Sequence, residues 1–136
     1  CAAINASSVA LVDAGIPCKD LLCACSAGFS VTKGEEMTPI VDLNRREESW
    51  SGGQPSVYLP CAMLPQRGTL VLSQCEARLP NYETLEKVLA AAMDGCRAVF
   101  DVLQAAIRER ASTMLAVRQG YGTVTNAFPK EPAITE

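Results

Sequence analysis

An uncharged stretch at residues 21–29 dominates the hydrophobic pattern of the chain. It contains only small and apolar side chains and shows no alternation between apolar and polar positions. A strand of this kind is usually buried on both faces, because regular alternation marks a strand with one solvated face. We therefore predict a central strand here, with helices packed against its sheet.

Two helices are predicted, one before the strands and one after them. Residues 2–14 are rich in alanine, Gly15 can adopt the left-handed conformation that ends a helix, and Pro17 cannot continue one. Residues 82–115 follow the i, i+3, i+4 spacing of a long amphipathic helix, with Asn81 as its N-cap. The outer face of this helix is either solvated or an ion-pairing interface, and its charged residues are Lys87, Asp94, Arg97, Asp101 and Arg108.

Three further strands complete the predicted sheet. Residues 39–43 are expected to form a hairpin with the central strand, and residues 56–64 and 69–77 flank a turn at 65–68. Pro60 cannot donate a hydrogen bond to a neighbouring strand, so we expect an edge strand or a bulge at that position. The order of helix, four strands and helix predicts an α+β fold, with a four-stranded mixed sheet between the two helices.

The polar segments between these elements define the expected organisation. Residues 30–36 and 44–55 are predicted to be loops, and the irregular residues 116–136 to be a tail that is either flexible or docked on a partner. Residues 1–115 then form one domain, in keeping with the length of 136 residues. Because the chain starts at Cys1 without an initiator methionine, we expect it to be a piece of a longer protein.

Composition narrows the class of protein. Hydrophobic residues make up 49% and charged residues 20% of the chain, which is typical of a globular domain. A net charge of -3 provides no global basic field for nucleic acid, so any RNA contact is expected to be local or made by an assembly. No apolar run reaches the roughly 18 residues that span a bilayer, so no membrane role is expected.

Cysteine and histidine usage restricts the chemistry. The chain has seven cysteines, an odd number, and no histidine, which excludes Cys-His and Ser-His pairs within it and every mixed Cys/His metal site. Cys23 and Cys25 share a face of the predicted strand and are expected to be core residues, whereas Cys18 is expected to be exposed. We predict reduced cysteines and no metal site; the other four are Cys1, Cys61, Cys75 and Cys96.

The segment INASSVALVDAGIPCKDLLCACSAGF, residues 4–29, resembles the second half of an RNase PH domain. Within that family it is most similar to a ring subunit of the RNA exosome, the eukaryotic counterpart of the archaeal catalytic ring subunit. The loop VDLNRREESW and the long helix follow in register, so the resemblance extends to about Leu115. It implies that this half-domain packs against a homologous first half outside this chain, in a six-membered ring with a central pore for RNA.

The resemblance implies a phosphate site at the start of the first helix. Active family members degrade RNA from its 3′ end by phosphorolysis, in which inorganic phosphate attacks the terminal phosphodiester and a nucleoside diphosphate leaves. They hold the phosphate with a Gly-Thr-Arg segment and with backbone N–H groups at the start of the next helix. In this chain the backbone of Cys1 and Ala2 corresponds to that helix start, and the arginine lies outside the chain.

The resemblance also implies an altered pair of carboxylates. Active members carry two aspartates six residues apart, which bind a metal ion and promote proton transfer. The corresponding positions here are Glu48 and Gln54, so the pair keeps one negative charge instead of two. We expect a vestigial site, with Mg²⁺ and inorganic phosphate required only if the protein is active.

Two features of the same loop have alternative interpretations. Arg45 and Arg46, the only adjacent basic pair, lie either on a solvated loop edge or against RNA phosphates, with Glu47 and Glu48 diluting their field. Trp50 either anchors the loop or an interface, or stacks on a base.

The first hypothesis is a non-catalytic structural subunit of the exosome ring, and therefore not an enzyme. The alternative is an active phosphate-dependent 3′-to-5′ exoribonuclease, and a third is an unrelated α+β protein-binding domain. The resemblance implies other RNase PH-like ring subunits, cap subunits and RNA as partners. It also implies a location in the nucleus, including the nucleolus, and in the cytoplasm.

Overall fold

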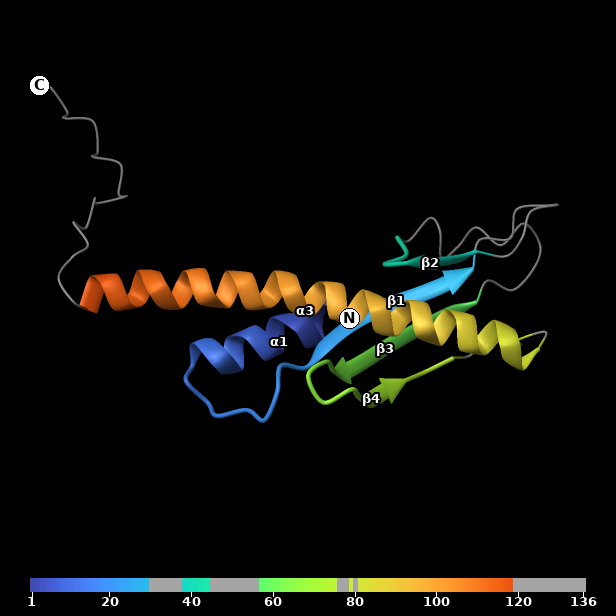
Figure 1. Ribbon diagram of the computed structural model, residues 1–136, viewed down its shortest axis with the longest axis horizontal. Helices are drawn as coiled ribbons and strands as arrows, with labels where there is room; N and C mark the ends of the chain where they lie inside the picture. The colour runs from blue at the N-terminus through green and yellow to red at the C-terminus, as the bar shows by residue number, and fades with distance from the viewer. Residues whose placement is uncertain (30–37, 45–56, 76–78, 80, 119–136) are drawn as a thin grey trace, which may run out of the picture.

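The computed structural model describes residues 1–29, 38–44, 57–75, 79 and 81–118. Within these residues one helix precedes four strands in the sequence and another follows them, as predicted, and the fold is α+β (Figure 1). The elements are α1 (Ala2–Asp13), β1 (Cys23–Phe29), β2 (Pro39–Val41), β3 (Tyr58–Leu64), β4 (Thr69–Ser73) and α3 (Tyr82–Arg118).

The four strands form one sheet in the order β2-β1-β3-β4, so β1 lies inside the sheet as predicted. All three strand pairs are antiparallel, and the expectation of a mixed sheet was therefore wrong. The reason is that short connections join both hairpins, whereas parallel neighbours need a long crossover.

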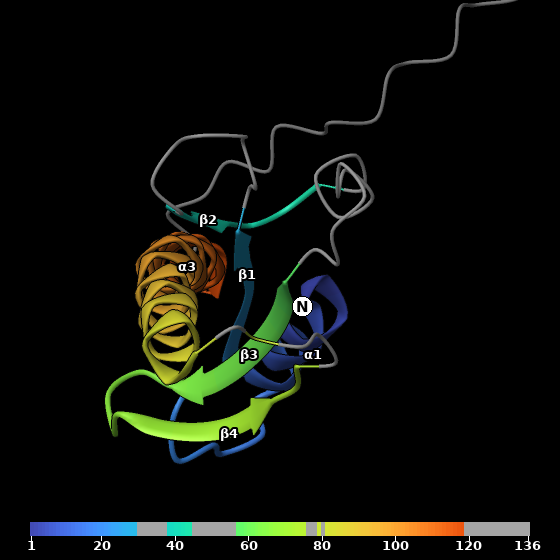
Figure 2. The same ribbon diagram turned by 90° about the vertical axis from the view of Figure 1, so that its right-hand side faces the viewer.

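The core lies between the sheet and α3. Every residue of β1 is buried, which confirms the prediction from its uncharged sequence. Alternate side chains of β1 and β3 face α3, whose contribution to the core is Val88, Ala92 and Cys96. The second half of α3 extends past the sheet and runs beside α1 (Figures 1 and 2).

Helix α1 is attached along the edge of β1 by side-chain hydrogen bonds. The side-chain amide of Asn5 donates to the Ala24 carbonyl at 2.9 Å, and its oxygen accepts from the Ala24 N–H at 2.8 Å. The Ser8 hydroxyl donates to the Leu22 carbonyl at 2.7 Å. Because β2 pairs only with Ala27–Phe29, these polar side chains replace the missing strand partner along the rest of that edge.

The end of α1 follows the sequence prediction. Gly15 has φ 73, the Ile16 N–H donates to the Leu11 carbonyl and the Gly15 N–H to the Val12 carbonyl, each at 3.0 Å. This is the Schellman arrangement, in which a left-handed residue lets the chain turn back and satisfy the last carbonyls.

The carboxylate of Asp20 then fixes the loop after α1 to the turn between β3 and β4. One oxygen accepts from the Leu21 N–H at 2.8 Å, and the other accepts from the N–H groups of Gln66 and Arg67 at 3.1 and 3.3 Å. The carboxylate thus joins two loops that are 46 residues apart in the sequence.

Pro60 lies in an interior strand, so the expected edge position was wrong, and the bulge falls between Ala62 and Met63 instead. Pro60 is opposite Ser26, whose carbonyl accepts a hydrogen bond from Asp42 on the other side of β1. Since backbone groups alternate in direction along a strand, the missing N–H of Pro60 points toward β4 and not toward β1. Strand β4 ends at Ser73, so the strand stops just before the position where it would pair with Pro60 and need a hydrogen bond from the missing N–H.

Helix α3 begins as predicted, because the Asn81 side chain accepts from the Thr84 N–H at 2.8 Å and also contacts the Thr84 hydroxyl. It continues to Arg118, three residues beyond the predicted end. Its exposed charges include the intrahelical pairs Lys87–Glu83 and Arg97–Asp94. These pairs favour the solvated interpretation of that face.

Candidate active site

The residues predicted to carry chemistry in the loop after β2 lie outside the described residues. These are Arg45, Arg46, Glu48, Trp50 and Gln54. The structure does describe the two ends of that loop, at Asn44 and Val57, and the strands that hold them. The roles assigned to these five residues stay predictions.

Asp42 turns the chain at the first end of the loop. Its φ of 58 is in the left-handed region, which aspartate tolerates better than most residues. Its N–H donates to the Ser26 carbonyl at 2.7 Å, and the next residue, Leu43, is 8% exposed. The turn therefore ends β2 and places Leu43 against the sheet before the loop begins.

Gly28 holds both ends of the loop close together. It pairs with Ile40 of β2 and with Tyr58 of β3. A Cβ atom at Gly28 would lie 2.2 Å from the Val57 carbonyl oxygen and 3.0 Å from a Leu43 methyl group. Only glycine permits this approach, and a glycine inside a buried strand was a signal in the sequence that could have located the contact.

Helix α1 starts at the predicted place. Cys1 is its N-cap, Ala2 is the first helical residue, and the Asn5 N–H donates to the Cys1 carbonyl at 3.0 Å. Cys1 and Ala2 are exposed, and the first turn contains no acidic residue. The free N–H groups of a first turn are suited to bind an anion. Phosphate binding by Cys1 and Ala2 remains a prediction.

The direction of α1 relates this helix start to the loop. Asn5 binds Ala24 and Ser8 binds Leu22, so α1 runs antiparallel to β1. Its N-terminus therefore points along β1 toward Gly28, which is four residues beyond Ala24, or about 13 Å of strand. The predicted phosphate-binding positions thus face the strand end that holds both ends of the predicted catalytic loop.

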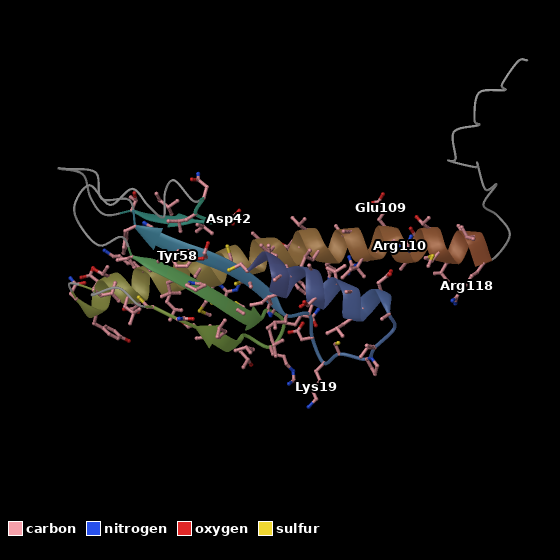
Figure 3. The ribbon with its side chains drawn as sticks, turned by 180° about the vertical axis from the view of Figure 1, so that it is seen from behind. Lys19, Asp42, Tyr58, Glu109, Arg110 and Arg118 are labelled. Carbon is pink, nitrogen blue, oxygen red and sulfur yellow. The ribbon has the colours of Figure 1, made fainter. Side chains whose placement is uncertain are left out.

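Figure 3 shows how far the labelled charged residues of α3 lie from the candidate site. Asp42 and Tyr58 lie at the end where the loop is attached, whereas Arg110 and Arg118 lie on the part of α3 that extends past the sheet. Arg110 is paired with Asp13 of α1, at 3.4 Å between Nε and Oδ1. The charged residues of the extended part of α3 are therefore remote from the candidate site.

All seven cysteines are free thiols, as expected. Cys1 and Cys18 are exposed, while Cys23, Cys25, Cys61 and Cys96 are buried. Burial raises the pKa of Cys23 to about 11 and that of Cys96 to about 12, so neither side chain is a nucleophile near neutral pH. Within the described ranges, no group of three or more Cys, Asp or Glu side chains is arranged to hold a metal ion.

Neither helix in the described part of the chain has both the length and the apolar character needed to cross a bilayer.

Comparison with known proteins supports the resemblance seen in the sequence. The chain is 40% identical over 108 residues to an exosome complex component RRP41 homolog of Arabidopsis thaliana and, over the same length, to the human exosome complex component RRP41. It is 38% identical over 109 residues to the exosome complex component Rrp41 of Thermococcus kodakarensis. The chain resembles the exosome Rrp41 components. No protein-family model matches it.

These similarities cover most of this chain and a smaller part of its Rrp41 relatives. They include 79% of the chain, 41% of the Arabidopsis protein and 40% of the human protein. The resemblance to an RNase PH-like exosome subunit is confirmed by about 40% identity over 79% of the chain. The helices and the antiparallel sheet of the described residues are consistent with the second half of an RNase PH-like domain.

The expectation that the protein is not an enzyme is contradicted. That expectation relied on two loop positions, Glu48 and Gln54, and on the charge lost between them. The similarity to archaeal Rrp41, the type of ring subunit that is catalytic in archaea, extends over 80% of the chain, and the identity is nearly as high as that to the human protein. The Rrp41 relatives therefore point to an enzyme.

Proposed function

We propose that the protein is an RNase PH-like ring subunit of an exosome, and that it takes part in phosphate-dependent degradation of RNA from the 3′ end. Its partners would be other RNase PH-like ring subunits, cap subunits and RNA. Its location would be intracellular, in the nucleus, including the nucleolus, and in the cytoplasm.

The observation that carries this proposal is the direction of α1. Its N-terminus points toward the strand end where Gly28 holds the two ends of the predicted catalytic loop. Phosphorolysis needs an anion site and an acid-base group near one phosphodiester. A helix start directed at a loop with carboxylates is suited to that requirement.

The roles follow from the chemistry of each group. The N–H groups at Cys1 and Ala2 would orient inorganic phosphate, one of whose oxygens attacks the terminal phosphorus. The 3′ oxygen of the shortened RNA leaves and takes up a proton, and the terminal nucleotide departs as a nucleoside diphosphate. Glu48 would hold or transfer that proton, and Gln54 would orient the same region through its amide.

A magnesium ion is compatible with this donor set. Glu48 offers a carboxylate and Gln54 an amide oxygen, and magnesium prefers oxygen ligands. Bound magnesium would offset negative charge at the phosphates. With one carboxylate instead of two, we expect weaker binding of the ion and a slower reaction than in a site with both aspartates.

The test uses the assembled complex and an RNA with a single-stranded 3′ tail. Phosphate-dependent release of nucleoside diphosphates is expected, with a loss of about 100-fold in Glu48→Ala, the size typical of removing an acid-base group. Glu47→Ala is the matched control, because it removes a neighbouring carboxylate, and it should retain the rate. Gln54→Asp should raise the rate by restoring the second carboxylate.

Two outcomes would refute the proposal. One is the absence of nucleoside diphosphate at any phosphate concentration. The other is an equal loss in the Glu47→Ala and Glu48→Ala variants, which would show that only the general charge of the loop matters.

A further inference from the structure

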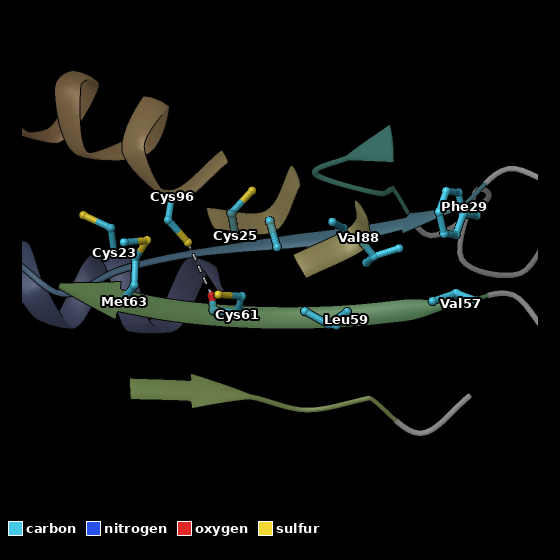
Figure 4. Close-up of a cluster of buried hydrophobic side chains, with 11 residues drawn as sticks. Cys23, Cys25, Phe29, Val57, Leu59, Cys61, Met63, Val88 and Cys96 are labelled. Atoms are coloured by element: carbon cyan, nitrogen blue, oxygen red, sulfur yellow. Dashed lines mark hydrogen bonds between the residues drawn. The ribbon is translucent and has the colours of Figure 1, made fainter. Parts of the chain in front are cut away.

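Three thiols from three elements meet in the core, and the proposed function uses none of them. Cys25 of β1 is directly opposite Cys61 of β3, and Cys96 of α3 lies over them (Figure 4). Their exposed fractions are 4%, 0% and 0%. The Cys96 thiol donates a hydrogen bond to the Cys61 carbonyl at 3.7 Å, so the two residues are in direct contact.

Gly95 explains why these groups are so close. A Cβ atom at this position would lie 2.6 Å from a Val41 methyl group and 2.7 Å from the Cys25 sulfur. The backbone of α3 therefore lies against the sheet itself, without an intervening side chain. This approach lets the short side chain of Cys96 reach a residue of β3.

We propose that Cys61 and Cys96 form a disulfide site that links α3 to β3 when the contact between helix and sheet opens in the presence of a peroxide. The opened Cys61 thiol loses its proton, and its thiolate attacks one oxygen of hydrogen peroxide; the departing hydroxide takes up a proton, giving a sulfenic acid and one water. The Cys96 sulfur then attacks the Cys61 sulfur and releases the second water. Two thiols and one peroxide thus give one disulfide and two waters.

Geometry favours this pair over Cys25 and Cys61. The Ser26 carbonyl points away from β3, so the adjacent Cys25–Cys61 pair is a hydrogen-bonded pair of the ladder. Opposed Cβ atoms in such a pair are up to about 5.5 Å apart on fixed backbones, whereas a disulfide needs about 3.5–4.5 Å. Cys96 is on a helix that can shift as a unit, and its thiol already contacts Cys61.

The closed fold protects both thiols. Neither is accessible to solvent, and burial raises the pKa of both groups, which keeps them protonated. Oxidation is therefore limited by opening of the contact between α3 and the sheet. Once formed, the bond holds α3 on β3 until a thiol reductant removes it.

The test treats the full-length protein with hydrogen peroxide, alone and in urea below the unfolding transition, and identifies linked peptides by non-reducing mass spectrometry. The peptide pair joining Cys61 to Cys96 should be the main intramolecular product. It should form at least tenfold faster in urea, where the contact opens more often. Amides of α3 should then exchange at least tenfold more slowly, and a reductant should reverse the effect.

Cys25→Ala serves as the control and should leave the Cys61–Cys96 link intact, whereas Cys96→Ala should abolish it. The wild-type peptide map is decisive even if a variant fails to fold. A predominant Cys25–Cys61 link, links confined to the exposed Cys1 and Cys18, or the absence of any intramolecular link would each overturn the proposal.

Discussion

Replacing Asn5 by alanine removes the side chain that pairs the free edge of β1. The two hydrogen bonds it makes to Ala24 are 2.8 and 2.9 Å long, and Ala24 is 1% exposed. Leaving a buried N–H and a buried carbonyl unpaired costs about 1–3 kcal/mol for each group, so we expect a loss of about 2–6 kcal/mol. This is a large part of the roughly 5–15 kcal/mol that stabilises a domain.

The assay is urea unfolding of the full-length protein, compared with Ser7→Ala as the matched control. Ser7 is on the same helix, but its hydroxyl donates only to the Ala3 carbonyl within the helix, and it is exposed. We expect that control to change the free energy of unfolding by less than about 0.5 kcal/mol. A similar small change in Asn5→Ala would refute the idea that Asn5 replaces a strand partner.

Three further changes test other contacts. Gly95→Ala should lower the free energy of unfolding by about 1–3 kcal/mol, because the added methyl group overpacks against Cys25. Helix propensity alone would predict the opposite, a gain in stability. Urea unfolding measures the sign of the change, and a gain would contradict the close contact between helix and sheet. Asp20→Ala should lower the free energy of unfolding by about 1–2 kcal/mol and speed amide hydrogen exchange at Gln66, because the turn between β3 and β4 loses its carboxylate partner. Unchanged exchange at Gln66 would contradict this role of Asp20. Folding raises the pKa of the Cys96 thiol, so the contribution of this thiol to the free energy of unfolding should be complete below about pH 9 and should fall as the pH rises toward about 12, by about 1 kcal/mol at pH 10. Urea unfolding of Cys96→Ala should show a smaller fall over this pH range. An equal fall in the variant would argue against Cys96 as the source.

The sequence predicted those features that depend on local patterns. The buried β1 followed from a run without charge, the end of α1 from Gly15, and the start of α3 from Asn81. Each of these depends on the residue type at one position or in one short window. The antiparallel hairpins were also expected from short turns, although the sheet was predicted to be mixed.

The remaining features depend on contacts between distant parts of the chain. Asn5 and Asp20 read as ordinary polar residues until the fold places them beside unpaired backbone groups 19 and 46 residues away. Pro60 was expected at an edge or a bulge, because the sequence does not say which side of the strand its missing donor faces. The expectation that the protein is not an enzyme was also wrong. It gave more weight to two substituted positions, Glu48 and Gln54, than to the similarity along most of the chain.

The destination of labelled inorganic phosphate tests the central claim most directly. The assembled complex is incubated with a 3′-tailed RNA and radiolabelled phosphate, and the released nucleotides are separated. Phosphorolysis predicts that the label appears in the terminal phosphate of nucleoside diphosphates. Release of unlabelled nucleoside monophosphates alone, or of no nucleotide, would contradict the account.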